Sequence, residues 1–336
     1  MVIADRKSNR IGYLDLFRGI GILIMVMGHV GFGNAFSHFY HAFHMPMWFF
    51  VSGYLFSKKP RHQLSDRAYI TKRFRSLMVP YFSFGLLFFA VWSVVHIRQW
   101  EPDDLIHLLF VNTNHLAYAD ALWFLTALFF ADCIYFLIRK HVPHGIPEHT
   151  AVVLLALFGN VAVKILPFRL PWALDAALVG VGLMHIGFLF GTHEENKTVH
   201  FVLNMNWTAI AAAAVLSAAL IFLNGAINMR NGYYAILPLF WFNATCACLI
   251  GFSVCKKICE WRWFSRAKQY FCSVGENSLV SLCLNQPIIL ILGVHLGMKA
   301  WGFPVSSMAI LILTMVLLWF AAELLLKTKL RFLLGK

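Results

Sequence analysis

The sequence predicts an all-α integral membrane protein, a polytopic bundle of about ten transmembrane helices. Three observations predict this class. Of the 336 residues, 60% are hydrophobic and only 13% are charged, whereas soluble domains carry roughly 25% charged residues. The apolar residues occur in blocks of about twenty, the length that crosses ~30 Å of hydrocarbon at ~1.5 Å per residue. Basic residues gather in short segments between these blocks.

Ten apolar blocks are candidate spans. No linker rich in Pro, Gly or Ser separates them, so residues 1–336 are expected to form a single membrane domain. In chain order the predicted spans cover 14–33, 41–57, 76–96, 121–138, 150–167, 172–191, 205–223, 234–254, 276–297 and 304–326. The second is weak because it is short and begins with histidines, and the fifth is weak because it ends near Lys164.

The basic segments predict the orientation of the bundle. With ten spans, every basic cluster falls on one side, which the positive-inside rule identifies as the cytoplasm. The clusters comprise Arg6, Lys7, Arg10, Lys58, Lys59, Arg61, Arg67, Lys72, Arg73, Arg75, Arg139, Lys140, Lys256, Lys257, Arg262, Arg266, Lys268, Lys327, Lys329, Arg331 and Lys336. The other side includes Glu101, Asp103 and Asp104. Both termini are therefore expected in the cytoplasm, and this distribution argues against nucleic-acid binding despite the net charge of +13.

The first span carries ionisable groups, which cost roughly 2.5–3.5 kcal/mol each inside a membrane and so need a reason. Arg18 and His29 are eleven residues apart, about three turns, and therefore share one helix face with ~16 Å between them along the axis. Asp15, three residues before Arg18, is placed to pair with it. Because histidine transfers protons near neutral pH, this face is a catalytic candidate. In the alternative, Arg18 and Asp15 extend to the cytoplasmic interface and His29 lies at the outer one.

Three histidines stand at the beginning of the second span. His38, His41 and His44 recur every three residues, which raises the question of a metal site. No metal is expected, because no Cys, Asp or Glu lies beside them in the sequence and successive i,i+3 positions turn by ~60° around a helix. They are expected to line the outer mouth of the bundle, with His44 as a candidate substrate contact.

Lys72, Arg73 and Arg75 stand where the basic loop enters the third span. They are suited to anchoring the helix against anionic membrane lipids. They are equally suited to binding the phosphates of a cytosolic cofactor, because arginine matches phosphate geometry. The residues alone favour anchoring over cofactor binding.

Further polar side chains lie at membrane depth. They are Asp132, Asp175, Asn277, Ser278, Asn285 and Gln286, and Trp123 stands at the outer end of the fourth span. One or two would serve as hydrogen bonds between helices, but so many indicate a polar cavity. No Walker loop, GxGxxG, GxSxG or HExxH motif occurs, so nucleotide hydrolysis, dinucleotide binding, esterase and metalloprotease activities find no support.

The segments LDLFRGIGILIMVMGH, FHMPMWFFVSGYLF, KRFRSLMVPY, LWFLTALFF and VGENSLVSL, in this order, resemble the acyltransferase family 3 membrane proteins, which O-acylate cell-surface glycans in bacteria. The resemblance is strongest over 11–125 and 275–287. It implies ten core helices, a bacterial inner-membrane location and an acyl-CoA donor, with acetyl-CoA the expected one. It also implies a glycan or lipid-linked sugar as the acceptor.

Position by position, the resemblance implies that Arg18 and His29 are the catalytic pair. The donor-binding segment falls on Lys72, Arg73 and Arg75, and the LWFL element falls on Trp123. Family members often carry a histidine where this chain has Asn285, so the acceptor contact there is expected to differ. The acceptor-binding candidates are His44, Trp123, Asn277, Ser278 and Asn285.

The expected reaction is transfer of an acyl group from cytosolic acyl-CoA to a glycan hydroxyl. His29 would act as general base or as nucleophile. Arg18, held by Asp15, would orient the donor or stabilise charge on the thioester oxygen. The alternatives are a transporter or flippase for a glycan or small solute, although no two related halves are visible, and a membrane scaffold, which leaves the alignment of Arg18 with His29 unexplained. Without the resemblance, enzyme and transporter are nearly balanced.

Overall fold

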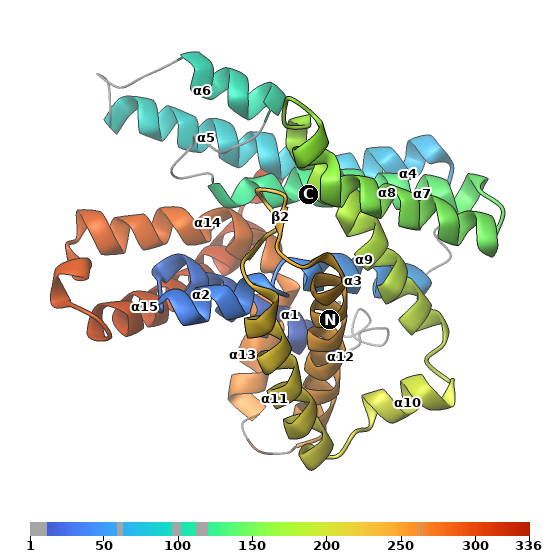
Figure 1. Cartoon of the computed structure of the whole chain (residues 1–336). Helices are drawn as coiled ribbons and strands as arrows, with labels where there is room; N and C mark the ends of the chain where they lie inside the picture. Colours follow the sequence, from blue (N-terminus) through green and yellow to red (C-terminus); the bar gives the residue numbers. More distant parts are fainter. Residues whose placement is uncertain (1–11, 59–62, 96–101, 112–119, 262, 264) are drawn as a thin grey trace, which may run out of the picture.

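The computed structural model describes the whole chain except residues 1–11, 59–62, 96–101, 112–119, 262 and 264. Within the described residues it is a helical bundle with one small β-hairpin (Figure 1). Its elements are α1 (Gly12–Val30), α2 (Asn34–His41), α3 (Pro46–Ser57), α4 (Asp66–Arg73), α5 (Val79–Val95), α6 (Pro102–Ile106), α7 (Trp123–His141), α8 (Ile146–Ile165), α9 (Leu174–Thr192), α10 (Lys197–Leu203), α11 (Trp207–Asn224), β1 (Ile227–Asn228), β2 (Tyr233–Tyr234), α12 (Leu237–Glu260), α13 (Ser265–Glu276), α14 (Ser278–Leu290) and α15 (Val305–Lys327). A π-helical turn, Phe74–Met78, joins α4 to α5.

Nine helical segments in the described part of the chain are long and apolar enough to cross a membrane. They correspond to nine of the ten predicted spans, and the predicted class of polytopic helical membrane protein is confirmed. The predicted span 41–57 differs from the other nine. It falls on the end of α2, a short turn and α3, and α3 has only 12 residues.

The α2–α3 pair nevertheless returns the chain across the depth of α1. Near the end of α1, Gly28 faces the ring of Tyr40 in α2, and midway along α1, Gly21 faces Met47 in α3. Near the start of α1, the hydroxyl of Tyr13 lies 2.7 Å from that of Tyr54 in α3. The pair thus runs beside α1 in the opposite direction. Nine of the twelve residues of α3 are buried in protein, where lipid thickness does not set the length of a helix.

Two glycines bring α3 and α9 into close contact. A Cβ at Gly53 would collide with the backbone of Met184, and a Cβ at Gly187 would collide with the backbone of Phe50. Small residues allow membrane helices to approach this closely. Of this pair, α3 contributes Trp48, Val51, Ser52 and Leu55 to the wall of the inner cavity described below.

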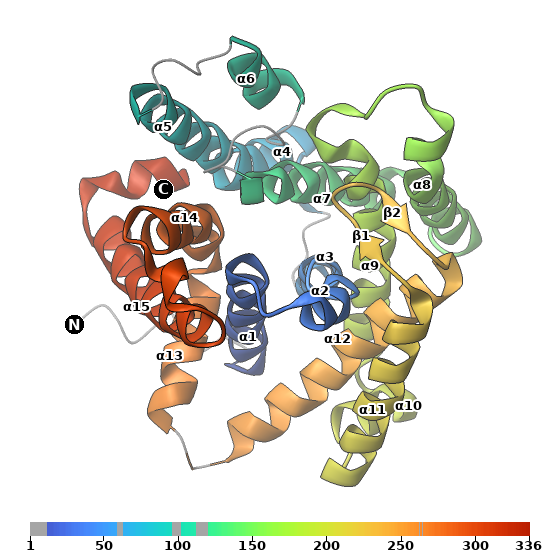
Figure 2. The ribbon, with the colours of Figure 1, turned by 60° about the vertical axis from the view of Figure 1, so that its left-hand side comes forward.

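Helix α1 lies in the middle of the bundle. Figure 2 shows it with α14 and α15 on one side and α2 and α3 on the other. Gly19 and Gly275 again mark close backbone contacts, with Phe271 of α13 and with Asp15 of α1 respectively. Three polar side chains of α1 contact side chains from distant parts of the sequence: Tyr13 contacts Tyr54, Arg18 contacts Ser278 and His29 contacts Asn285.

The two ends of the bundle differ in character. At the end where α1 begins, here called the basic end, Lys58 pairs with Glu194, Lys140 pairs with Asp66 at 2.6 Å, and Gly335 packs on the backbone of Arg75. The opposite end, here called the histidine end, carries α2 and the hairpin. Several residues used to predict orientation lie outside the described residues, namely Arg6, Lys7, Arg10, Lys59, Arg61, Glu101 and Arg262.

Candidate active site

Three cavities follow one another from the basic end to the histidine end, and neighbouring cavities share a lining residue. The basic pocket, about 590 Å³, and the inner cavity, about 250 Å³, share Ser76. The inner cavity and the outer cavity, about 170 Å³, share Leu282. The inner and outer cavities lie along α1, which contributes Arg18 and Ile22 to the first and Met25 and His29 to the second.

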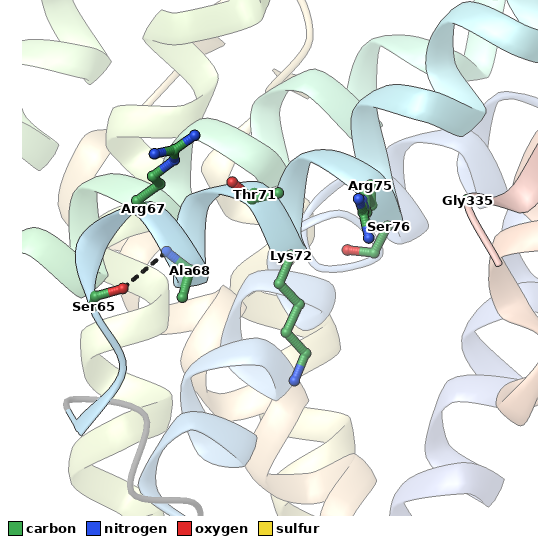
Figure 3. A pocket seen from close by; sticks show the side chains of 8 residues that line it. All are labelled: Ser65, Arg67, Ala68, Thr71, Lys72, Arg75, Ser76 and Gly335. Atoms are coloured by element: carbon green, nitrogen blue, oxygen red, sulfur yellow. Dashed lines mark hydrogen bonds between the residues drawn. The ribbon is translucent and has the colours of Figure 1, made fainter.

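The basic pocket is built on α4 and the π-helical turn that follows it. Figure 3 shows its lining: Ser65, Arg67, Ala68, Thr71, Lys72, Arg75, Ser76 and Gly335. Ser65 begins α4 by accepting a hydrogen bond from the backbone N–H of Ala68 at 3.2 Å, a standard N-cap. Three cations and three hydroxyl groups make this pocket suited to a phosphorylated ligand. Lys72 and Arg75, two of the three cations predicted to bind the donor, both line this pocket.

Arg73 does not join that pocket. It lines the inner cavity instead and forms an ion pair with Asp132 of α7, which is completely buried. The other carboxylate oxygen of Asp132 accepts a hydrogen bond of 2.9 Å from Ser52 of α3. The predicted trio of donor-binding cations is therefore divided, because the charge of Arg73 is compensated inside the bundle.

Arg18 also lines the inner cavity. Its guanidinium lies 3.6 Å from the carboxylate of Asp15, so the predicted pairing on α1 is present. It also donates a hydrogen bond of 2.7 Å to the hydroxyl of Ser278, the first residue of α14. Ser278, a predicted acceptor contact, thus lies beside Arg18 rather than beside His29.

His29 lines the outer cavity and is held by Asn285 of α14. The Nδ1 atom of His29 lies 2.5 Å from Oδ1 of Asn285. The Asn285 amide nitrogen donates to the carbonyls of Ser281 at 2.9 Å and Leu282 at 2.7 Å, which fixes the orientation of the amide. Oδ1 must therefore accept a hydrogen bond from Nδ1–H, and in the neutral ring Nε2 carries the lone pair. His29 is in the tautomer that a general base at Nε2 requires.

We expect Asn285→Leu to lower the turnover of acyl transfer about 5- to 150-fold. The replacement removes the acceptor that orients His29, and a lost hydrogen-bond partner costs about 1–3 kcal/mol, where about 1.4 kcal/mol is tenfold in rate. Asn285→Asp is the matched control, because it keeps an oxygen opposite Nδ1 and should retain more activity than the leucine variant. Full activity of purified, folded Asn285→Leu would contradict this role.

The outer cavity contains several other polar side chains from four parts of the sequence. Its polar and aromatic lining comprises His29, Tyr40, His41, His44, Asp120, Trp123, Asn228, Arg230 and Gln286. The predicted contacts His44 and Trp123 are present. Asn277 is not, because its amide donates to the carbonyl of Ser273 at 3.0 Å and it lines neither interior cavity.

Asp120 and Arg230 were not predicted from the sequence. Arg230 lies in the loop between two predicted spans, and Asp120 lies at the edge of a long loop, so no local pattern distinguishes either. Gln286 had a signal, as one of several amides at membrane depth.

The three histidines in and just after α2 each form a hydrogen bond with a backbone carbonyl. His38 contacts the carbonyl of Ile221 at 3.1 Å, His41 that of Ser37 at 2.7 Å, and His44 that of Tyr40 at 2.9 Å. In the described part of the chain, no group of three or more His, Cys, Asp or Glu side chains is arranged to hold a metal ion.

The fold and the cavities define a multi-pass membrane protein with a hydrogen-bonded histidine in the last of three neighbouring cavities. The acyltransferase domain of acyltransferase family 3 matches residues 11–323, and the chain belongs to this family. It is therefore an acyltransferase, and the transporter and scaffold alternatives are set aside. A comparison with curated proteins finds no significant match.

Proposed function

We propose that this acyltransferase moves an acyl group, acetyl in the simplest case, from cytosolic acyl-CoA to a hydroxyl of a cell-surface or lipid-linked glycan. The observation that carries the proposal is the row of three cavities that leads from a basic pocket to His29. The positive-inside rule assigns the basic end to the cytoplasm, in this proposal that of a bacterium, whose inner membrane holds the bundle. Donor and acceptor then enter from opposite ends of the bundle.

In this proposal the nucleotide phosphates of CoA bind Lys72 and Arg75, and the pantetheine arm extends past Ser76 into the inner cavity. Arg18 lines the inner cavity and is therefore placed to contact the pantetheine arm of the donor. Its ~16 Å axial separation from His29 places it too far from the reacting carbonyl to stabilise the thioester oxygen. Of the two roles open to Arg18, orienting the donor is therefore the one that the geometry favours.

The reaction takes place in the outer cavity. His29 removes the proton of the acceptor hydroxyl through Nε2 while the oxygen attacks the thioester carbonyl. An ester C–O bond forms, the C–S bond breaks, and the CoA thiolate receives the proton from the imidazolium. Asn285 keeps the proton on Nδ1 and the ring in place before and after this transfer, because its own amide hydrogens remain bound to backbone carbonyls.

The proposal is tested by following release of free CoA from acetyl-CoA by the purified protein in nanodiscs, with and without sugars. Release that depends on the acceptor supports acyl transfer. Acetyl-CoA binding that cannot be detected at millimolar donor would refute the assignment of acyl-CoA as donor. A burst of acetylated protein before steady state would assign His29 as nucleophile instead of base.

Replacing both Lys72 and Arg75 with alanine is expected to raise the KM for acetyl-CoA about tenfold or more, with a smaller effect on kcat. Each charge-assisted hydrogen bond contributes about 1.5–3 kcal/mol, and the phosphates bind far from the reacting carbonyl. The matched substrate is acetyl-pantetheine, which lacks the nucleotide and its phosphates, and its KM should be nearly the same in variant and wild type. Equal losses with both donors would contradict phosphate binding at this pocket.

A further inference from the structure

The β-hairpin that connects α11 to α12 reaches the outer cavity. Its two strands pair Ile227 with Tyr234, and Asn228, Met229 and Arg230 line the cavity. Arg169, which lies outside the hairpin, anchors the hairpin backbone by donating a hydrogen bond of 2.7 Å to the carbonyl of Arg230. The same guanidinium donates to the buried carboxylate of Asp175 at 2.8 Å. The position of the hairpin is thus supported by contacts that do not involve the side chain of Arg230.

A glycine completes this anchorage. Gly232 has φ = 66°, a backbone conformation that favours glycine. A Cβ there would collide with Val163 of α8. The hairpin therefore packs directly on the bundle at this position.

The side chain of Arg230 forms an ion pair with Asp120 inside the outer cavity. Asp120 begins the short turn before α7, and the next residue, Ala121, donates its N–H to Gln286 at 2.8 Å. The backbone is thus anchored at Arg230 itself and at Ala121, the residue after Asp120. Their side chains keep 21% (Arg230) and 33% (Asp120) exposure, so both remain accessible to a ligand in the same cavity as His29.

The charge and size of the cavity restrict its ligand. Asp120 and Arg230 cancel, and the remaining polar lining consists of amides, a phenol, an indole and histidines. An anionic ligand would therefore find no net positive charge to offset the cost of removing its own charge from water. The volume of about 170 Å³ is below the roughly 300–1,000 Å³ typical of pockets for drug-sized ligands. The cavity is therefore suited to one small, uncharged, hydroxyl-rich ring.

From this arrangement we infer that Asp120 and Arg230 bind the acceptor, and that the acceptor is presented as an uncharged sugar residue with neighbouring hydroxyl groups. This inference rests on the proposed function. The carboxylate accepts hydrogen bonds from two adjacent hydroxyls, the guanidinium donates to their oxygens, and the rings of Tyr40 and Trp123 offer apolar faces. A third hydroxyl then faces His29.

The first test compares acceptors with the wild-type protein in nanodiscs. Methyl glucoside, methyl galactoside and methyl mannoside are the uncharged probes, the corresponding methyl uronosides are the anionic ones, and cyclohexanol has a single hydroxyl. At least one uncharged sugar is expected to accelerate CoA release with a KM at least tenfold below those of the uronosides and cyclohexanol. Uronosides that match or exceed the uncharged sugars, or acetyl-CoA turnover that no uncharged sugar accelerates, would overturn the inference.

The second test asks whether Asp120 and Arg230 bind the acceptor or whether their ion pair only stabilises the fold. Arg230→Gln and Asp120→Asn are expected to raise the acceptor KM at least tenfold while the KM for acetyl-CoA changes less than twofold. The exchange Asp120→Arg with Arg230→Asp preserves an ion pair but reverses its direction. It should restore any thermal stability that the single variants lose, whereas the acceptor KM stays raised. Asn231→Ala, an exposed hairpin residue, is the matched control and should behave as wild type.

The outcomes also distinguish this inference from the proposed function. An acceptor KM that returns to the wild-type value in the exchange variant would show that the ion pair only stabilises the fold and does not bind the acceptor, while acyl transfer itself remains intact. Failure to bind or use acetyl-CoA in the wild type would instead refute the proposed function.

Discussion

Replacing His29 with alanine is expected to lower kcat for acyl transfer by about 10²- to 10⁴-fold, the usual contribution of a general base. The hydrogen bond to Asn285 suits the side chain to this role, because it places the ring proton on Nδ1 and leaves Nε2 unprotonated. The KM for acetyl-CoA should change little, because the groups proposed to bind the donor line the basic pocket and the inner cavity.

The measurement is acceptor-dependent CoA release, with the donor affinity of each variant determined in parallel. His193→Ala is the control: His193 lies in the exposed turn at the basic end of α9, where its Nδ1 lies 2.9 Å from the carbonyl of Leu189. It should retain wild-type activity. If His29→Ala protein is folded, binds acetyl-CoA and still acylates the acceptor at the normal rate, His29 is not the base.

Replacing Asp132 with alanine is expected to lower the free energy of unfolding by about 3–5 kcal/mol, the cost of breaking a buried ion pair by removing one partner. Asp132 is completely buried. Its loss leaves the Arg73 guanidinium in the inner cavity without its carboxylate and also removes the acceptor for Ser52. Arg73→Met should destabilise the protein for the complementary reason, because it isolates the buried carboxylate.

Thermal and denaturant unfolding in detergent provide the measurement. The double variant Arg73→Met with Asp132→Leu should recover most of the lost stability, because an apolar pair of similar size removes both charges. Asp66→Ala, which removes the exposed partner of Lys140, is the control and should have a much smaller effect. A single Asp132→Ala variant as stable as wild type would show that the ion pair does not hold α7 against α4.

Much of the fold could be predicted because its signals are local. A block of about twenty apolar residues has few stable arrangements other than a membrane-spanning helix, since each backbone polar group must be satisfied within the segment. Nine predicted spans correspond to long helices. The predicted span 41–57 is the exception, because α3 within it has only 12 residues and is mostly buried in protein. Hydropathy measures how apolar a segment is and does not show which helices will surround it.

In the candidate site, too, the features that depend on local sequence could be predicted, whereas the contacts between helices could not. The spacing on α1 predicted that Arg18 and His29 share a face, because eleven residues are close to three turns, and Asp15 lies beside Arg18 as its spacing requires. The acyltransferase family was likewise recognisable from motifs in the sequence, and the family match confirms it. These features depend on helix geometry and residue order alone.

Partners across the bundle were decided only by tertiary structure. Lys72, Arg73 and Arg75 are neighbours in sequence, yet Arg73 pairs with Asp132 inside the bundle while the other two line the basic pocket. Asn285, on α14, forms a hydrogen bond with His29 on α1. Helical periodicity determines the direction in which a side chain leaves its own helix, whereas its partner depends on which helices pack together and at what depth, and contacts more than 250 residues apart leave no local pattern.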